Sequence, residues 1–445
     1  MSWKRRNFLI FASLGTTAGI FASTSSCSNQ SSAINQEVED SSSNFASPVE
    51  ETNSLTGKPS SDEWQDIRND FNLDPNYIHL AGLLLTSHPA PVHQAIEEYQ
   101  RELNSNPAFY VQDNNYQLQA QVRQAAANYL KTQPNEIALT DSTTMGTALI
   151  INGIKIRQDQ EMLTSEFDYY STHQSLRYKA ERSGASYREI SSYQNIQTVS
   201  EEEIVNTLIK SVRPETRLVT ATWVHSSTGL KVPIRLIADQ LEEINANRDQ
   251  SDRILFLVDG VHGLGVEDAS MADLNCDFFT AGTHKWLFAP RGTGIIWGNP
   301  RSLSEVSPTI PTFTQDGGWG GQMTPGGFKP FEHLWAMTEA FNFHQQIGKS
   351  RITERIHSLS QHLKEELAQM SHVTLYTPIS DNLSAGIVCF DLDGFSPRQV
   401  VQQLRKNNIV ASTTPYNPSH ARLTPGIYNT HSEVETTLKI IHELA

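Results

Sequence analysis

Cysteine is scarce in this chain of 445 residues, which has three, at positions 27, 276 and 389. None of them forms a Cys-x-x-Cys pair, and no His/Cys group has the spacing of zinc ligands, so no metal site is expected. Cys276 and Cys389 lie in apolar stretches typical of strands. That setting favours buried, unreactive thiols.

Positive charge is also limited, because 34 Lys and Arg stand against 49 Asp and Glu and give a formal net charge of −15. The basic run Lys4-Arg5-Arg6 is too short to provide the electrostatic surface that nucleic-acid binding needs. Hydrophobic residues make up 38% and charged residues 19% of the chain. This balance is typical of a folded enzyme and excludes a largely disordered chain.

The apolar stretch at residues 9–22 is too short for a membrane span, which needs about 20 residues. It follows Arg5-Arg6-x-Phe-Leu, which resembles a twin-arginine export signal, and an ordinary secretory signal is the alternative. Cys27 is a candidate lipid acceptor, although the usual aliphatic residue three positions earlier is missing. Residues 1–27 therefore predict recognition by an export machinery and a place in the periplasm or cell envelope, with a lipid tether at Cys27 left open.

Residues 28–60 are rich in Ser, Asn and Glu and are predicted to be a linker. From residue 61 onward, apolar strand-like runs alternate with stretches long enough for a helix. This alternation predicts βαβ units and a mainly parallel sheet. The runs are 136–140, 161–165, 186–190, 218–223, 254–259, 277–282 and 294–297.

A second region begins after Gln346 with a long helical pattern, followed by short apolar runs and two further helical patterns. The sequence thus predicts two unequal α/β domains, a large one at residues 61–345 and a small one at residues 346–445. We find no internal repeat.

The strongest chemical signal lies at the ends of two neighbouring strand-like runs. The first run ends in Asp259 and the second leads into His284-Lys285, with 285 − 259 = 26 residues between the carboxylate and the lysine. In open α/β sheets, ligands bind at the carboxyl ends of the strands, so both side chains can face one crevice.

This pair suits pyridoxal 5'-phosphate (PLP). A partly desolvated lysine has a lowered pKa and forms a Schiff base with an aldehyde. An aspartate that faces the pyridine nitrogen keeps it protonated and makes the ring an electron sink. The alternative, a helix-capping Asp259 and a surface Lys285, fits poorly with a lysine between His and Trp at the end of an apolar strand.

A phosphate site is predicted where the 136–140 strand meets the next helix, at the polar turn Asp141-Ser142-Thr143-Thr144. Backbone N–H groups and hydroxyls at a helix N-terminus bind anions. Ordinary helix capping by these residues is the alternative. The position of the turn, upstream of the Asp259/Lys285 pair, favours the phosphate.

The segments VDGVHGLG and AGTHKWLFAPRGTGIIW resemble the aminotransferase class V family, which includes cysteine desulfurases, kynureninase and isopenicillin N epimerase. The resemblance extends from about Tyr77 to the C-terminus. It implies PLP-dependent fold type I, in which a three-layer αβα large domain with a seven-stranded sheet precedes a smaller C-terminal domain. It also implies a homodimer with sites at the interface.

The resemblance further assigns roles to residues. Lys285 would carry the cofactor and act as general acid and base, Asp259 would pair with the ring nitrogen, and His262 would lie beside the ring hydroxyl. Thr143 and Thr144 would hold the phosphate from one side and His284 from the other.

Two more roles follow from the resemblance. Phe167 falls where relatives stack an aromatic residue on the ring, with Tyr169 or Tyr170 as alternatives and a core role also open. Arg422, in the segment ARLTPGIYNT, would bind the substrate carboxylate, which suits a planar bidentate donor.

The chain also departs from its relatives. Where they have Asn near the ring hydroxyl, Ser226 or His225 must substitute, and where they have Ser before the lysine this chain has Gly282. The phosphate would then depend on Thr280, Thr283 or a neighbouring subunit. The glycine-rich loop 317–328 would either reach across a dimer interface or be a plain linker.

The segment IVASTTPYNPSHARL has no cysteine where a desulfurase carries its nucleophile, so cysteine desulfuration is disfavoured. The sequence predicts a PLP enzyme that acts on an amino acid or small carboxylated amine by transamination, epimerisation or elimination. Two alternatives are a non-catalytic PLP-binding envelope protein and a nucleotide-binding oxidoreductase. DGVHGLG suggests the latter, but its glycines do not follow G-x-G-x-x-G and its acidic residue precedes them.

Overall fold

A computed structural model describes residues 61–313 and 317–444 of the chain. The predicted export signal, the linker and Cys27 lie outside these residues. Within the described ranges, no helix combines the length and hydrophobicity that crossing a membrane requires.

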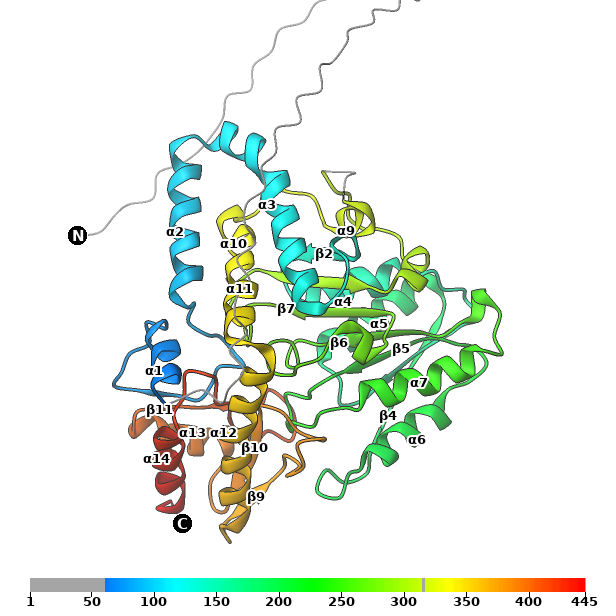
Figure 1. The fold of residues 1–445 in the computed structure, drawn as a ribbon. Helices are drawn as coiled ribbons and strands as arrows, with labels where there is room; N and C mark the ends of the chain where they lie inside the picture. The colour runs from blue at the N-terminus through cyan, green and yellow to red at the C-terminus, as the bar shows by residue number, and fades with distance from the viewer. Residues whose placement is uncertain (1–60, 314–316, 445) are drawn as a thin grey trace, which may run out of the picture. The chain divides into compact units, whose positions relative to one another are not determined.

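A seven-stranded sheet forms the centre of the larger part (Figure 1). Its strand order is β2-β8-β7-β6-β5-β3-β4, and β3 to β7 run parallel to one another. The predicted α/β fold with a mainly parallel sheet is confirmed. The strands are β2 (Ile137–Thr140), β3 (Glu161–Ser165), β4 (Ser186–Ile190), β5 (Thr216–Thr222), β6 (Leu255–Asp259), β7 (Phe278–Gly282) and β8 (Gly294–Gly298).

Strand β8 runs antiparallel to both of its neighbours, β2 and β7. Its connection from β7 spans only residues 283–293, too short for the helical crossover that parallel neighbours need. The short connection therefore turns β8 back along β7 and places the loop that contains Lys285 at the carboxyl end of the sheet.

Helices cover both faces of the sheet, because alternate residues of each strand point to opposite sides. In β6, Leu255 and Leu257 share a core with α4 and α5, whereas Phe256 and Val258 share another with α6 and α7. The three-layer arrangement follows from this alternation. The covering helices are α4 (Thr143–Gly153), α5 (Tyr170–Ser183), α6 (Glu201–Ser211) and α7 (Ile234–Asn245).

A pair of long helices, α2 (Ala90–Ser105) and α3 (Pro107–Leu130), precedes the first strand of this sheet. Asn106 separates them, and Pro107 starts α3 at the position where a missing N–H costs nothing. They pack against α10 (Phe331–Trp335) and α11 (Met337–Ile347). The strand pattern gave no indication of this helical pair.

The C-terminal region has a four-stranded antiparallel sheet in the order β12-β13-β10-β9, with a core of its own. This region combines helices and strands, as the larger part does. Its elements are α12 (Lys349–Gln369), β9 (Val373–Leu375), β10 (Val388–Leu392), α13 (Pro397–Lys406), β11 (Ile409–Val410), β12 (Ser412–Thr413), β13 (Ala421–Leu423) and α14 (His431–His442).

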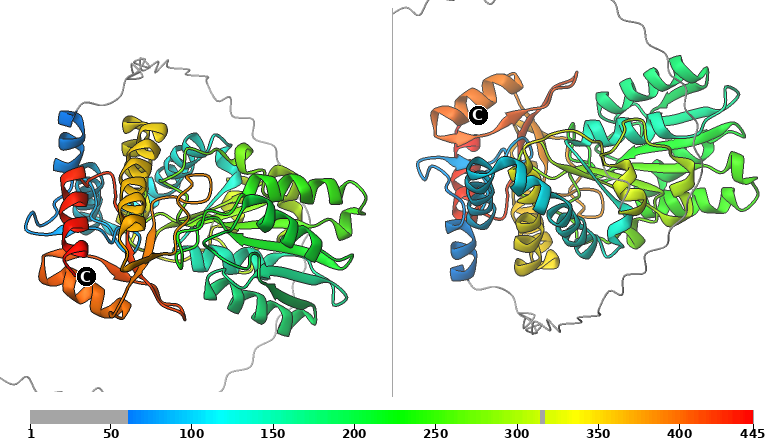
Figure 2. Two further views of the ribbon diagram at one scale, coloured as in Figure 1. Left: turned by 90° about the horizontal axis from the view of Figure 1, so that it is seen from below. Right: turned by 90° about the horizontal axis from the view of Figure 1, so that it is seen from above.

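The segment before α2 packs on this C-terminal region. Strand β1 (Ile78–His79) pairs in parallel with β11, and Arg68 of α1 (Ser61–Asn69) forms an ion pair of 2.6 Å with Glu433 of α14. Figure 2 shows this blue segment beside the red last helix. The chain thus starts on the small domain, crosses to the large one and returns.

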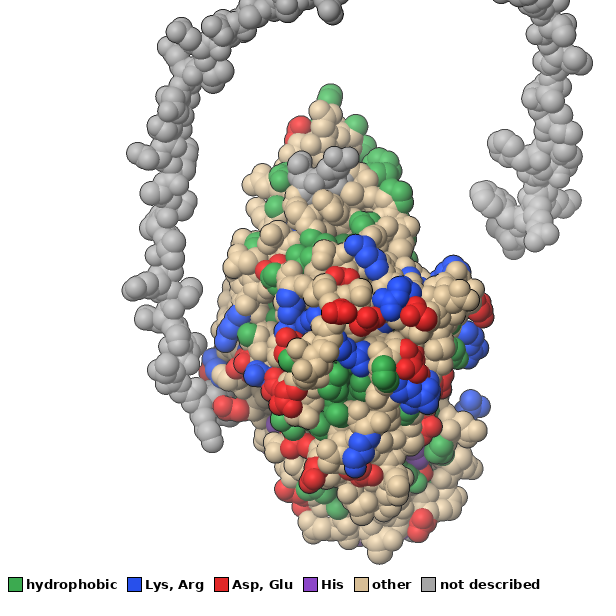
Figure 3. All heavy atoms as spheres, turned by 90° about the vertical axis from the view of Figure 1, so that its right-hand side faces the viewer, with side chains coloured by type: hydrophobic (Ala, Val, Ile, Leu, Met, Phe, Trp, Pro, Cys, Tyr) green, Lys and Arg blue, Asp and Glu red, His purple; other side chains and the backbone are tan. Residues whose placement is uncertain are grey.

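The glycine-rich stretch 317–328 is not a plain loop. It begins with helix α9 (Gly318–Met323), which packs on β2. A Cβ on Gly320 would lie 2.1 Å from the carbonyl oxygen of Ile137, so only glycine permits this close approach. On the face drawn in Figure 3, basic and acidic side chains are interspersed and do not form a field of one sign.

Candidate active site

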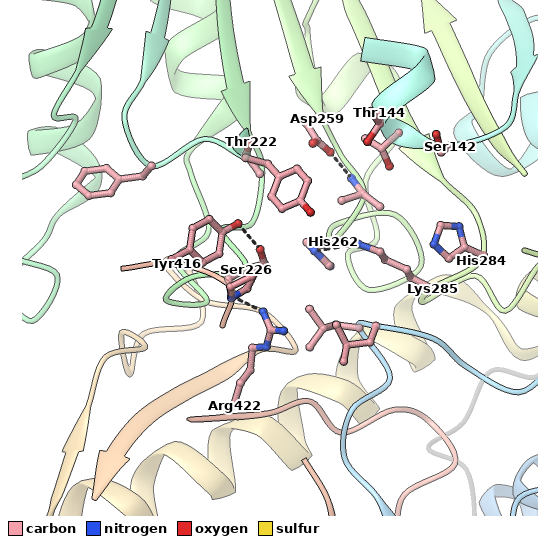
Figure 4. Close-up of a pocket in the computed structure, with 17 residues that line it drawn as sticks. Ser142, Thr144, Thr222, Ser226, Asp259, His262, His284, Lys285, Tyr416 and Arg422 are labelled. Carbon is pink, nitrogen blue, oxygen red and sulfur yellow. Dashed lines mark hydrogen bonds between the residues drawn. The ribbon is translucent and has the colours of Figure 1, made fainter. Parts of the chain in front are cut away.

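A cavity of about 270 Å³ opens at the carboxyl ends of β5, β6 and β7, and the C-terminal region closes it from the other side (Figure 4). It brings together every site residue that the sequence predicted. Those residues are Thr143, Thr144, Phe167, Ser226, Asp259, His262, His284, Lys285 and Arg422. Residues separated by up to 279 positions in the chain thus share one space.

Asp259 ends β6 and is 6% exposed. Burial raises the pKa of its carboxyl to about 6, although the Val261 N–H bond (3.1 Å) and the Lys285 ammonium oppose that shift. Gly260 follows because a Cβ there would lie 1.9 Å from the ring of Phe279. The glycine lets the chain turn tightly and hold Asp259 at the base of the cavity.

Lys285 reaches the cavity from the loop after β7. Burial lowers the pKa of its amine to about 8, with a further decrease from Arg422 and an opposing effect of Asp259. A decrease from 10.5 to about 8 makes the neutral amine more abundant at neutral pH by roughly two orders of magnitude. The amine is therefore prepared to act as a nucleophile and a base.

His262 lies beside Lys285, with 3.4 Å between its Nε2 and the lysine Nζ. Its Nδ1 accepts the indole N–H of Trp286 at 3.3 Å, so the hydrogen of the neutral ring is on Nε2. Burial, together with the neighbouring Lys285 cation, lowers the pKa of His262 well below its ordinary value. The neutral imidazole thus directs an N–H at the lysine amine.

The predicted phosphate site forms where α4 begins. The Ser142 hydroxyl accepts the Met145 N–H at 3.1 Å and caps the helix. Thr143 Oγ1 accepts the Gly282 N–H at 2.7 Å, which leaves its own hydroxyl hydrogen for another acceptor. The first N–H groups of a helix have no partner within the helix. Together they form a donor set suited to an anion.

Two further observations fit a phosphate here. The Nδ1 atom of His284 is buried and has no hydrogen-bond partner among the described residues. A Cβ on Gly282 would lie 3.1 Å from both Thr143 Oγ1 and His284 Cε1, so a serine at that position would crowd the site. Thr280 and Thr283 bond instead to Thr147 and Thr293 and do not line the cavity.

The aromatic candidates separate in the structure. Phe167 stacks on Tyr193 with ring centroids 4.2 Å apart, and both Phe167 and Tyr169 line the cavity. Tyr170 is 58% exposed and does not line it. Asp168, between Phe167 and Tyr169 in the chain, is buried and accepts the Thr222 N–H at 2.7 Å. This bond holds the turn that carries the two aromatic residues against β5. No motif in the sequence indicated this anchoring carboxylate.

Arg422 on β13 is 1% exposed and donates three hydrogen bonds to neutral oxygens, namely Ser226 O (2.6 Å), Ser412 Oγ (3.1 Å) and Thr413 O (3.3 Å). A guanidinium has five N–H donors, so two remain. No Asp or Glu in the described ranges forms an ion pair with it. An unpaired buried cation at a cavity wall is suited to an anionic ligand.

Of the two candidates, Ser226 lines the cavity and His225 does not. Its hydroxyl shares a hydrogen bond of 2.7 Å with the hydroxyl of Tyr416. Tyr416 was not among the site residues predicted from the sequence. A tyrosine between Pro415 and Pro418, in the segment that lacks the desulfurase cysteine, was the available signal.

The family model described as aminotransferase class-V matches residues 85–436. This chain belongs to the aminotransferase class V family. Among relatives of this class, the isopenicillin N epimerase of Streptomyces clavuligerus is 26% identical over 84% of this chain and 96% of its own. A probable cysteine desulfurase of Xylella fastidiosa (strain Temecula1) is 22% identical over 87% of this chain and 97% of its own.

Solved structures of a cystine lyase and of cysteine desulfurases have the same fold. A complex of the cystine C-S lyase C-DES with its product cysteine persulfide superposes with a TM-score of 0.74 at 23% identity, covering 83% of this chain and 98% of that one. The cysteine desulfurase CsdA of Escherichia coli gives 0.72 at 16% identity, covering 85% and 98%. The fold is that of fold type I enzymes, and the cofactor is pyridoxal 5'-phosphate.

Proposed function

We propose that this class V protein is an enzyme that removes the α-proton of an amino acid or a small carboxylated amine, with Lys285 as the residue that holds PLP and moves the proton. One observation carries the proposal. A lysine amine with a lowered pKa shares a cavity with a buried carboxylate, Asp259, and an unpaired buried cation, Arg422.

Bound PLP supplies an aldehyde for attachment and a ring that withdraws electrons from the substrate. Lys285 would attach the cofactor and, once displaced by substrate, take the α-proton as a neutral amine. The His262 Nε2–H, 3.4 Å from the lysine nitrogen, would orient the amine once substrate has displaced it from the cofactor. Asp259 would keep a proton on the ring nitrogen, and Thr143, Thr144 and His284 would hold the phosphate.

Arg422 would bind the substrate carboxylate through the two N–H groups that its protein contacts leave free. Hydrogen bonds to Ser412, Thr413 and Ser226 hold the guanidinium in one position, so a bound carboxylate would also be held in one position. A carboxylate held there fixes the orientation of the α-hydrogen, and orientation decides which bond breaks.

Arg422→Ala tests whether the substrate carries a carboxylate. A charge-assisted bond contributes about 1.5–3 kcal/mol, so kcat/KM with an α-amino acid is expected to fall roughly 10- to 150-fold. With the matching amine that lacks the carboxyl group, kcat/KM should change little, and the cofactor absorption spectrum should stay unchanged. An equal loss with both substrates would make Arg422 structural and remove the support for an amino-acid substrate.

The reaction classes within this proposal are transamination, epimerisation and elimination. Desulfuration through an enzyme thiol is outside it, because burial raises the pKa of both Cys276 and Cys389, the latter to about 12. Neither thiol lines the cavity. The similarity to desulfurases therefore does not extend to a thiol nucleophile among the described residues of the cavity.

We also propose a homodimer. Helix α3, residues 312–313 and residues 324–334 line a groove of mixed apolar and polar side chains, and several large apolar side chains on these segments are exposed. Exposed apolar patches of this kind mark protein interfaces. The exposed residues are Phe109, Tyr116, Phe313 and Phe328.

Export remains a proposal drawn from the first 27 residues. Replacing Arg5 and Arg6 by lysine is expected to leave the protein in the cytoplasm, because the twin-arginine route reads the arginine pair, whereas a secretory signal needs only positive charge. Cell fractionation with a protease-accessibility assay measures the outcome. Unchanged export of the double variant would identify a secretory signal instead.

A further inference from the structure

The loop between β12 and β13 is closed at its base by three hydrogen bonds. The Thr414 N–H donates to His420 O at 2.9 Å, the His420 N–H donates to Thr414 Oγ1 at 2.9 Å, and the Ser419 hydroxyl donates to Thr414 O at 2.7 Å. His420 is also held by Asp391 at 3.0 Å. The chain therefore presents the apex of this loop, Tyr416, in a fixed position over the cavity.

The Tyr416 hydroxyl belongs to the cavity wall. It lies 2.7 Å from Ser226 Oγ, and Arg422 binds the carbonyl of the same Ser226 at 2.6 Å. Figure 4 shows Tyr416 and Lys285 entering from opposite sides, with Arg422 below the space between them. A substrate whose carboxylate is on Arg422 would thus have one proton-carrying group on each side of its α-carbon.

We propose that Tyr416 is a second proton-transfer residue, which exchanges a proton with the α-carbon on the side opposite Lys285, so that this chain inverts an α-amino acid. This inference rests on the proposed function and names its reaction. Inversion requires a proton acceptor on one side of the α-carbon and a proton donor on the other. In the described cavity, Lys285 would be the acceptor and Tyr416 the donor.

The proton inventory balances without another reactant. The α-C–H bond breaks as the proton passes to the neutral Lys285 amine, which becomes an ammonium. The electron pair left on carbon forms a new C–H bond with the proton of the Tyr416 hydroxyl, which becomes a phenolate. The opposite enantiomer reacts by the reverse transfers, and proton exchange with solvent restores the starting pair.

The protonation states agree with these roles. Burial raises the pKa of Tyr416 to about 12, so the phenol carries its proton at neutral pH and can donate it to the α-carbon. The Ser226 hydroxyl and the Arg422 cation act in the other direction and stabilise the phenolate after transfer. The amine of Lys285, with its lowered pKa, can accept the α-proton that leaves the substrate.

The test uses the PLP-loaded enzyme in D2O with each of the protein L-amino acids supplied singly. Proton NMR measures loss of the α-hydrogen, and chiral chromatography measures the D-enantiomer. The wild type is expected to exchange and to invert at least one substrate. Tyr416→Phe should still exchange with retained configuration through Lys285, while inversion falls by about 10²–10⁴-fold, the range of general acid–base catalysis.

Two variants separate proton transfer from a structural role. Tyr187→Phe removes a phenol hydroxyl on β4, which does not line the cavity, and should keep inversion. Ser226→Ala removes the partner of the phenol but leaves its proton, so inversion should fall less than in Tyr416→Phe. For Tyr416→Phe, the PLP dissociation constant and the melting temperature should match the wild type, which a merely structural residue would not give.

Inversion retained by Tyr416→Phe, or lost equally in Ser226→Ala, would overturn the role of Tyr416. Exchange without inversion by the wild type would overturn the inference and leave the proposed function standing. Absence of exchange with every amino acid would overturn this inference and remove the protein amino acids from the substrates of the proposed function.

Discussion

Lys285→Ala should fold and still bind PLP through its phosphate site, yet lose the absorption band of the lysine-attached cofactor that borohydride reduces. Turnover should fall by more than the 10²–10⁴-fold typical of a lost proton-transfer group, because attachment and proton transfer are lost together. Within residues 61–313 and 317–444, the only side-chain hydrogen-bond contact of the amine is the 3.4 Å approach to His262. Its removal therefore costs little packing, and the melting temperature should change little.

Lys364 provides a matched control, because it is fully buried yet far from the cavity. Its ammonium donates to Ile379 O at 2.8 Å and Ser384 Oγ at 2.6 Å and lies 3.3 Å from Asp381. Lys364→Ala should lower the melting temperature, since it leaves these acceptors unpaired, and should keep the borohydride-sensitive band. A band that survives in Lys285→Ala would show that another lysine carries the cofactor.

The sequence predicted the central sheet and the position of Asp259 and Lys285 in one cavity, because both depend on local patterns. Each strand is a short apolar run, and parallel strands align their carboxyl ends at one edge. Asp259 and the segment before Lys285 had to meet there once β6 and β7 were neighbours. The direction of β8 was not predicted, since the apolar pattern of a strand is the same in either direction.

Contacts between distant segments were beyond the sequence. The bond of Thr143 to the Gly282 N–H, and that of Tyr416 to Ser226, join residues 139 and 190 positions apart. No periodicity or motif specifies such a pair, because it depends on how two packed elements meet. The hydrogen on His262 Nε2 likewise follows from Trp286, whose side chain is placed by the fold and not by its position in the motif.

The carboxylate of Asp259 is expected to decide how well the cofactor ring accepts electrons. Asp259→Asn should retain PLP but lose about 10²-fold or more in kcat, because a neutral amide cannot hold the proton on the ring nitrogen. The amide oxygen can still accept the Val261 N–H, now at 3.1 Å, so the tight turn at Gly260 should persist. The loss should therefore be chemical and not structural.

Asp277 offers a matched control within the same sheet. It directly precedes β7, is 2% exposed, and pairs with Arg253 at 3.0 Å and Arg301 at 2.9 Å without lining the cavity. Asp277→Asn should lower stability while the turnover of the folded, PLP-loaded fraction stays unchanged. Comparing the two variants separates the loss of any buried carboxylate from the loss of the one that faces the ring.

The pH dependence of cofactor binding tests Asp259 independently of turnover. Because burial raises its pKa to about 6, the carboxyl is neutral below that pH and can no longer balance a protonated ring nitrogen. Binding to the wild-type apoenzyme should then weaken by up to about tenfold for each unit that the pH falls below 6. Asp259→Asn has no carboxyl to titrate and should lack this step, as fluorescence titrations from pH 5 to 8 would measure. Equal pH profiles, or near wild-type turnover of the variant, would show that a group other than Asp259 keeps the ring nitrogen protonated.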